Sequence, residues 1–193
     1  MEKAMENPIS ENELWLLSFY RTSELSGALF FGRLARALRA GPIQRDLTHH
    51  FADESQHAWY WTRCIAELGA EPIQLGRAYQ DRYLAAAGLP ANLMEVLAIT
   101  QVFEARVIGQ YNLHRHAPTL RPTVKETLDR ILEDEKWHIQ WVRAALEGME
   151  SKYGQDKVRA TLERYAGADR EVYRQTIVEH EERVGDLMKL KRR

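Results

Sequence analysis

The sequence of 193 residues contains a single cysteine, Cys64. One thiol cannot form an internal disulfide, and it cannot build a cysteine-based zinc or rubredoxin-type iron site. This cysteine usage suits a reducing compartment. The opening residues, MEKAMENP, lack the apolar stretch of a signal peptide. We therefore expect a cytoplasmic protein.

Long hydrophobic runs and an excess of either charge are also missing. No segment approaches the roughly 18 apolar residues that a membrane helix requires, so we expect no membrane partner. The formal net charge of −1 gives no overall attraction to nucleic acid, and we expect no such partner. One local cluster of arginines indicates a solvated helix end, with a phosphate-bearing partner as the lesser alternative. The cluster consists of Arg33, Arg36, Arg39 and Arg45.

What the sequence does contain is helical periodicity. Apolar residues recur at steps of three and four along four long stretches, which predicts an all-α fold. The predicted helices span about residues 11–40, 43–69, 92–117 and 119–151. Ser10 and Asn92 each precede a glutamate by three residues, so both predict helix caps. Thr119 or Thr123, with Pro122 near the first turn, is expected to open the fourth helix.

Two segments lie outside these four helices. Residues 70–90 hold at most a short helix at about 77–87, and they are long enough to run the full length of a bundle. After residue 154 we predict two helices, at about 156–166 and 169–190. One stripe of the last helix either docks on the bundle or forms a contact with a second copy of the chain, as in a homodimer, or with another partner. This stripe consists of Tyr173, Ile177, His180, Val184 and Leu187. We expect a single domain, with a bundle at 11–150 and an extension at 151–193.

A repeated motif carries the chemistry. Asp-Glu-x-x-His occurs at residues 53–57 and again at 134–138, and each copy lies within a predicted helix. Glu and His three residues apart share one helix face, so both can reach the same metal ion. On the first and third helices, Glu24 and Glu104 are the lone acids on otherwise apolar faces. The spacing from lone acid to motif is nearly the same, 24 to 54 and 104 to 135, which indicates two similar hairpins.

Six inward side chains can therefore converge in the core. Four buried carboxylates are very costly unless cations neutralise them, and two divalent metals would supply that charge. Carboxylates with one imidazole per metal suit iron or manganese, so we expect two iron ions, with Mn/Fe or Mn/Mn as alternatives. Glu54 and Glu135 are the predicted bridges. The predicted ligands are Glu24, Glu54, His57, Glu104, Glu135 and His138.

Other polar residues are candidates near this centre. Asp53 and Asp134 precede the ligand glutamates, and each is predicted to hold the histidine of the opposite hairpin. His50 is a candidate for a further polar group at the site. Tyr20 and Tyr111 are candidates for relaying electrons or protons. The alternative is that each is an ordinary core tyrosine whose hydroxyl is hydrogen-bonded. Apolar residues that can wall a cavity or simply fill the core are Phe31, Trp61, Phe103, Ile108 and Val142.

On these residues, the chain resembles the ferritin-like di-iron carboxylate superfamily over about residues 11–150. The superfamily includes bacterioferritin, rubrerythrin, the aldehyde-deformylating oxygenases and a tRNA hydroxylase. The resemblance implies an up-down-down-up four-helix bundle with a long crossover between helices 2 and 3. Rubrerythrins add a second glutamate where this chain has Val107, and a cysteine-rich domain that it lacks. Ferritins and bacterioferritins end soon after the fourth helix, whereas about forty residues follow here.

These departures favour one function over two alternatives. We expect an oxidoreductase, of the oxygenase or oxidase type, that activates O2 or peroxide. Its partners would be a small, largely apolar substrate and an external electron donor. The first alternative is a ferroxidase or iron-storage protein. The second is a metal-stabilised helical module that binds a partner through its C-terminal stripe.

Overall fold

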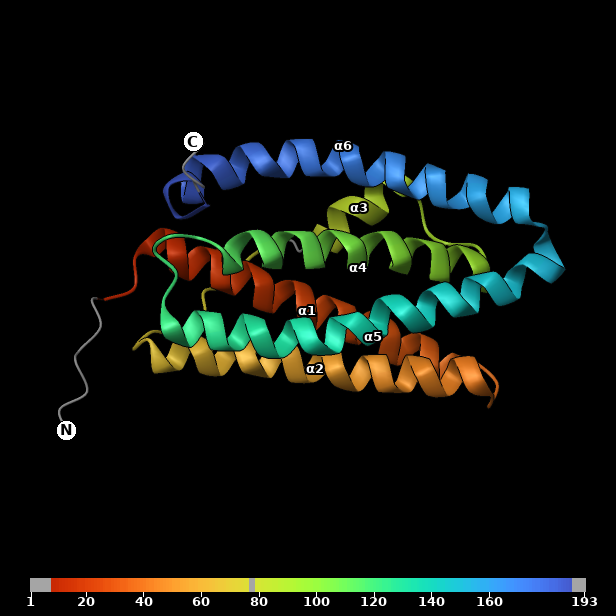
Figure 1. Cartoon of the computed structure of the whole chain (residues 1–193), viewed down its shortest axis with the longest axis horizontal. Helices are drawn as coiled ribbons and strands as arrows, with labels where there is room; N and C mark the ends of the chain where they lie inside the picture. Colours follow the sequence, from red (N-terminus) through yellow and green to blue (C-terminus); the bar gives the residue numbers. More distant parts are fainter. Residues whose placement is uncertain (1–7, 77–78, 189–193) are drawn as a thin grey trace.

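The computed structural model of the chain describes residues 8–76 and 79–188, without the side chains of 79–81, 177 and 179–188. This part of the chain folds into six helices and no strands (Figure 1). The helices are α1 (Glu11–Ala37), α2 (Pro42–Glu67), α3 (Tyr79–Ala87), α4 (Leu93–Arg115), α5 (Pro122–Tyr153) and α6 (Gln155–Met188). The expectation of an all-α protein is confirmed. None of the helices described is long and apolar enough to cross a membrane.

Four long helices surround the centre of the molecule. In Figure 1, α1 and α5 run from left to right, whereas α2 and α4 run from right to left. The segment between α2 and α4 crosses the length of this bundle, and α3 lies within it. Backbones pack closely between α1 and α2, between α4 and α5, and between α2 and α5. Among the described residues α1 and α4 make no such close approach, so side chains must fill a wider space between them.

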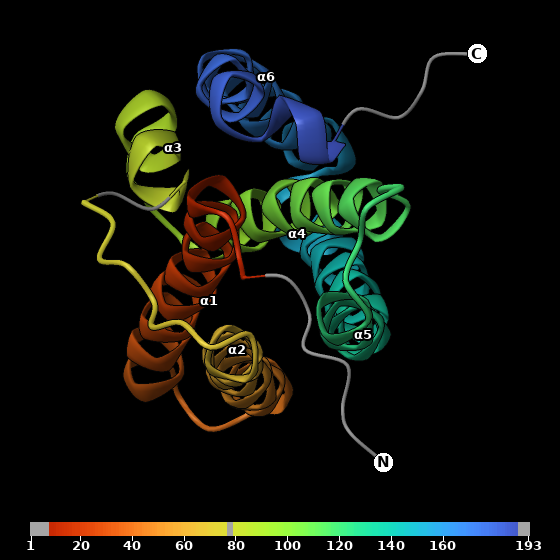
Figure 2. The ribbon, with the colours of Figure 1, turned by 90° about the vertical axis from the view of Figure 1, so that its left-hand side faces the viewer.

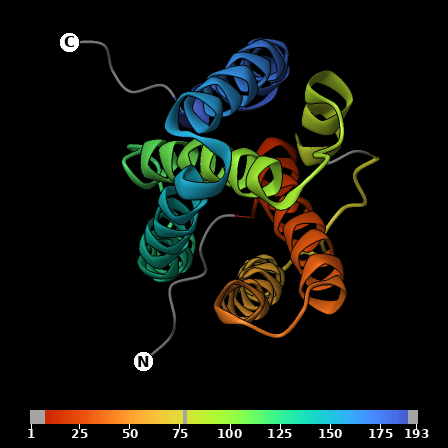
Figure 3. The same cartoon turned by 90° about the vertical axis from the view of Figure 1, so that its right-hand side faces the viewer.

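The C-terminal extension is one helix rather than two. The expected break at about residues 167–168 is wrong, because α6 continues through it. Its buried side chains keep helical spacing across Gly167, and packing against α4 and α3 outweighs the roughly 1 kcal/mol that an interior glycine costs. Those side chains are Val158, Thr161, Tyr165, Asp169, Val172 and Thr176. Viewed from either end, α6 and α3 cover the α4 and α1 side of the bundle (Figures 2 and 3).

Most of the predicted C-terminal stripe cannot be compared with the structure. The side chains of Ile177, His180, Val184 and Leu187 lie outside the described residues. Tyr173 is half-buried, and the guanidinium of Arg106 lies 3.8 Å from the centre of its ring. This part of the stripe therefore contacts α4.

The sequence predicts a capping residue at the start of three helices, and the structure confirms two of these caps. The side chain of Ser10 accepts a hydrogen bond from the amide of Glu13, at 3.2 Å, and Asn92 caps α4 in the same way. Pro122 lies in the first turn of α5 as predicted, but neither Thr119 nor Thr123 caps the helix, so that part of the prediction is wrong. Arg121 occupies the N-cap position directly before Pro122, and its guanidinium pairs with the carboxylate of Glu13 at 2.9 Å. This pair joins the start of α5 to the start of α1.

Candidate metal centre

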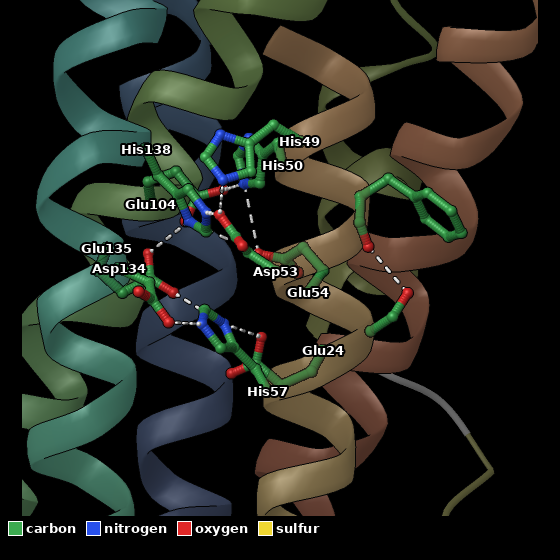
Figure 4. Close-up of polar contacts among 12 residues, drawn as sticks. Glu24, His49, His50, Asp53, Glu54, His57, Glu104, Asp134, Glu135 and His138 are labelled. Atoms are coloured by element: carbon green, nitrogen blue, oxygen red, sulfur yellow. Dashed lines mark hydrogen bonds and ion pairs between the residues drawn. The ribbon is translucent and has the colours of Figure 1, made fainter. Parts of the chain in front are cut away.

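The six predicted ligands lie together at the middle of the bundle (Figure 4). Each comes from the buried face of its helix, and the two motif helices place Glu and His one turn apart as the spacing requires. None is more than 3% exposed. They are Glu24 from α1, Glu54 and His57 from α2, Glu104 from α4, and Glu135 and His138 from α5.

Their oxygen and nitrogen atoms form two groups, each able to hold a metal ion. Site A, as we name it, consists of Glu24, Glu54, His57 and Glu135. Site B consists of His50, Glu54, Glu104 and His138. Within each site, one ligand atom from every residue lies within 4.8 Å of the others. Glu54 belongs to both, which places its carboxylate between the two sites.

Glu135 also faces both sites. Its Oε1 lies 3.5 Å from Nδ1 of His57, and its Oε2 lies 3.2 Å from Nδ1 of His138. One carboxylate therefore reaches a histidine of each site with a different oxygen. Glu54 and Glu135 thus occupy positions from which each can bridge two ions, the role that the sequence predicts for them.

Two aspartates hold the outer nitrogens of these histidines. Nε2 of His57 lies 3.2 Å from Oδ2 of Asp134, and Nε2 of His138 lies 3.1 Å from Oδ2 of Asp53. Each hydrogen bond joins α2 to α5 and leaves Nδ1 of the ring facing the carboxylates. A carboxylate that accepts the other N–H is the usual support of a metal-bound histidine. The role of Asp53 and Asp134 toward a metal stays a prediction.

Burial and mutual repulsion raise the pKa values of two of the carboxyl groups. Burial raises the pKa of Glu54 well above its ordinary value, and the charges of Glu24 and Glu104 raise it further. Burial and the charge of Glu104 raise the pKa of Glu135 to about 7. Protons are thus retained on acids that would be ionised in water. A cation at the same place would relieve the repulsion without protons.

The pKa values of the histidines beside them are raised as well, against the effect of burial. Burial alone would lower the pKa of His57, but Asp134 and Glu24 raise it to about 10. For His138, the charge of Glu135 and the hydrogen bond to Asp53 likewise overcome burial and raise the pKa to about 10. In the metal-free protein, imidazolium groups therefore neutralise part of the carboxylate charge.

Several polar atoms of the centre lack a hydrogen-bond partner, and this tests whether the residues fit a metal. Nδ1 of His57, Oε1 of Glu104 and Oε1 of Glu135 are buried without an acceptable hydrogen bond among the described residues. A buried polar atom without a partner is costly. These atoms all belong to sites A or B, so metal ions would satisfy them together. The donor set fits divalent iron or manganese.

The two candidate tyrosines have different surroundings. The hydroxyl of Tyr111 donates to Oε1 of Glu24 and accepts from Nε1 of Trp61, at 3.2 Å. Tyr20 packs edge-on against Tyr111, with ring centres 4.8 Å apart, but it belongs to neither site. Only Tyr111 of the pair therefore touches a predicted ligand. The hydrogen bond from Trp61 was not predicted, although Trp61 lies one turn beyond His57 on the same face.

An apolar cavity of about 240 Å³ lies beside the centre. Two of the predicted wall residues, Phe31 and Phe103, line it. The other three do not belong to its lining: Trp61, Ile108 and Val142. Of these, Trp61 and Val142 are wholly buried in the core. Gly27 separates the cavity from the metal ligands: a Cβ at this position would lie 2.1 Å from Oε2 of Glu54. The remaining lining residues are Ser26, Gly27, Leu29, Phe30, Arg33, Tyr83, Leu84, Ile99 and Thr100.

Comparisons with protein-family models and with curated protein sequences find no match for this chain. The fold and the site therefore define its class. It is an all-helical protein whose buried acid and histidine clusters can hold metal ions.

Proposed function

We propose that the chain is a ferritin-like, two-metal carboxylate oxidoreductase that activates O2 or peroxide. The observation that carries the proposal is the sharing of Glu54 by two buried ligand groups. The directions of the four long helices and the crossover between α2 and α4 support a ferritin-like bundle. Four carboxylates with histidine favour iron, or manganese in one or both sites. When bound, such ions supply the electron transfer and O2 chemistry.

The protein residues hold and orient this centre. Asp53 and Asp134 select the ring nitrogen that each histidine presents, because each aspartate accepts from Nε2. Tyr111 holds a proton against Glu24, and Trp61 fixes the direction of that hydroxyl. Tyr111 is thus placed to deliver or withdraw a proton at Oε1 of a site A ligand.

The cavity supports a small, largely apolar substrate. Its walls are mainly aliphatic and aromatic, and across Gly27 it adjoins the carboxylate of Glu54. The centre is shielded from bulk water, since none of the six predicted ligands is more than 3% exposed. A substrate in the cavity would lie against the centre without a layer of solvent. An external electron donor completes the reaction.

Metal analysis tests the shared basis of the proposal. Protein produced with iron is expected to hold about two metal ions per chain, and the double variant Glu54→Ala, Glu135→Ala is expected to hold almost none. Fewer than about one ion per chain in the unchanged protein, with no further loss in the double variant, would refute every two-metal function.

Oxygen uptake then tests the reaction. The iron-loaded protein, reduced chemically and mixed with O2, is expected to consume reductant and O2 repeatedly and to remain a small particle by size exclusion. A shell-sized particle that deposits ferric mineral would instead establish iron storage. Metal binding without any O2 consumption would leave the helical interaction module as the function.

A further inference from the structure

The two hairpins of the bundle match at every predicted ligand but differ at a buried position beside the ligands. Glu24 corresponds to Glu104, and the two Asp-Glu-x-x-His motifs correspond to each other. His50 lies four residues before Glu54 on α2, and its counterpart four residues before Glu135 on α5 is Ile131. Both side chains are wholly buried. Site B therefore contains an imidazole that has no equivalent in site A.

His50 lies as close to the carboxylates as the predicted ligands do. Its Nε2 is 3.2 Å from Oε1 of Glu104 and 3.3 Å from Oε1 of Glu54 (Figure 4). Despite these distances, neither ring nitrogen makes a hydrogen bond of acceptable geometry with the described residues. A histidine that merely donated to Glu104 would be aligned with it. The nitrogen points instead into the group of atoms that makes up site B.

Stacked rings hold His50 in this orientation. Phe31 stacks on one side, with ring centres 3.9 Å apart, and His138 stacks with a separation of 3.7 Å. Phe31 is itself the counterpart of Tyr111, since each lies seven residues after the lone glutamate of its hairpin. At site A the tyrosine hydrogen-bonds Glu24, whereas at site B the phenylalanine supports an imidazole. The two substitutions form one local difference between the sites.

We propose that His50 is a direct metal ligand of site B, the seventh protein ligand of the centre, and that it makes the two sites selective for different ions. Site B offers two imidazoles and two carboxylates, and site A offers one imidazole and three carboxylates. Imidazole suits iron, nickel, copper and zinc, whereas carboxylate oxygens suit manganese. Site B is therefore the iron site when both metals are present, and site A is the one that accepts manganese. The proposal rests on the two-metal centre of the proposed function, and it does not require the O2 reaction.

The direct test is a crystal structure of the protein loaded without oxygen with equal amounts of Fe(II) and Mn(II). Anomalous scattering at the two absorption edges is expected to place iron at site B and manganese enriched at site A. We expect a ring nitrogen of His50 about 2.0–2.2 Å from the ion at site B, by analogy with other metal–imidazole bonds. An ion at site B with His50 unbound would overturn the proposal.

A variant tests the same point in solution. Titration of the metal-free protein with Co(II), followed by the visible spectrum and by calorimetry, is expected to show two steps. His50→Gln should weaken one step by at least about tenfold and leave the other unchanged. The matched control is His114→Gln, since His114 is also a buried histidine but belongs to neither site. It should leave both steps unchanged.

The outcomes separate this proposal from the proposed function. If the unchanged protein binds two Co(II) ions and His50→Gln binds them equally well, the role of His50 is refuted and the two-metal centre stands. If the unchanged protein binds no Co(II), both fail. Should His50→Gln not fold by circular dichroism, the crystal structure of the unchanged, metal-loaded protein decides alone.

Discussion

His57 on α2 and Asp134 on α5 are joined by a hydrogen bond of 3.2 Å between Nε2 and Oδ2, across the middle of the bundle. Asp53 and His138 make the same contact in the opposite direction, at 3.1 Å. Each motif therefore orients the histidine of the other. A change in either aspartate should therefore be felt at a histidine that the other helix carries.

Replacement of Asp134 by Asn should weaken metal binding by about 10- to 100-fold without unfolding the protein, because the His57 ring loses its carboxylate acceptor. Competition with a coloured chelator would measure the affinity. The matched control is Glu133→Gln, which removes the same charge from the neighbouring residue, whose side chain is 73% exposed. Equal affinities for the two variants would show that Asp134 has no supporting role.

Gly27→Ala should disturb the centre, because the new Cβ would lie 2.1 Å from Oε2 of Glu54. Overpacking of this kind costs about 1–3 kcal/mol. We expect lower stability and lower metal occupancy, measured by urea unfolding and metal analysis. Gly109→Ala is the control, since a Cβ there meets nothing within 4 Å and should stabilise α4 by up to about 1 kcal/mol. A Gly27 variant that gained stability in the same way would contradict the close approach of Glu54.

Tyr111→Phe should destabilise the metal-free protein by about 1–3 kcal/mol, because Trp61 loses its acceptor and Glu24 loses a donor. Tyr20→Phe is the comparison, since this tyrosine packs beside Tyr111 but contacts no ligand of either site. Chemical denaturation with chelator present would give both values. The prediction fails if the Tyr20 variant loses as much stability as the Tyr111 variant.

The metal-free protein should lose stability as the pH rises from about 7 to 10. His57 and His138 have folded pKa values of about 10, raised above the ordinary value of 6.5. The folded state therefore binds more protons than the unfolded state in this interval, and the stabilisation disappears as those protons leave. Melting temperatures at pH 7 and pH 9.5, with chelator, would measure the loss.

Bound metal ions should reverse the dependence of the protein's stability on pH. Metal ions bind deprotonated ligands, so their affinity should rise over the same pH interval and the loaded protein should resist the loss. A metal-free protein whose melting temperature stayed constant or rose between pH 7 and pH 9.5 would contradict the assignment of protonated histidines.

Much of the centre was predictable because it depends on short-range spacing. A glutamate and a histidine three residues apart must share a helix face, and lone acids on apolar stripes must face the core. The spacing of His50 and Glu54 likewise predicted that both side chains face the core, since residues four apart also share a helix face. Its place among the ligand atoms depends on tertiary packing against Phe31 and His138, which periodicity does not reveal.

Other features depend on how helices meet. The role of Gly27 follows from the register between α1 and α2, which the sequence of either helix leaves open. The position of Arg121 at the N-cap of α5 is stabilised by an ion pair with Glu13, 108 positions earlier in the chain. The continuity of α6 through Gly167 follows from its packing against α4 and α3. In each case a distant contact outweighed the local signal.

The one-sided placement of α3 and α6 gives the centre two unlike approaches. On the α1 and α4 side, the apolar cavity leads to Gly27 and the carboxylate of Glu54. On the α2 and α5 side, Asp53 and Asp134 have side chains that are 21% and 42% exposed, and they link water to the histidines. The same buried centre therefore has an apolar cavity on one side and partly exposed carboxylates on the other. A substitution on one side can change the shape of the cavity while sparing the aspartates, and a substitution of an aspartate can spare the cavity.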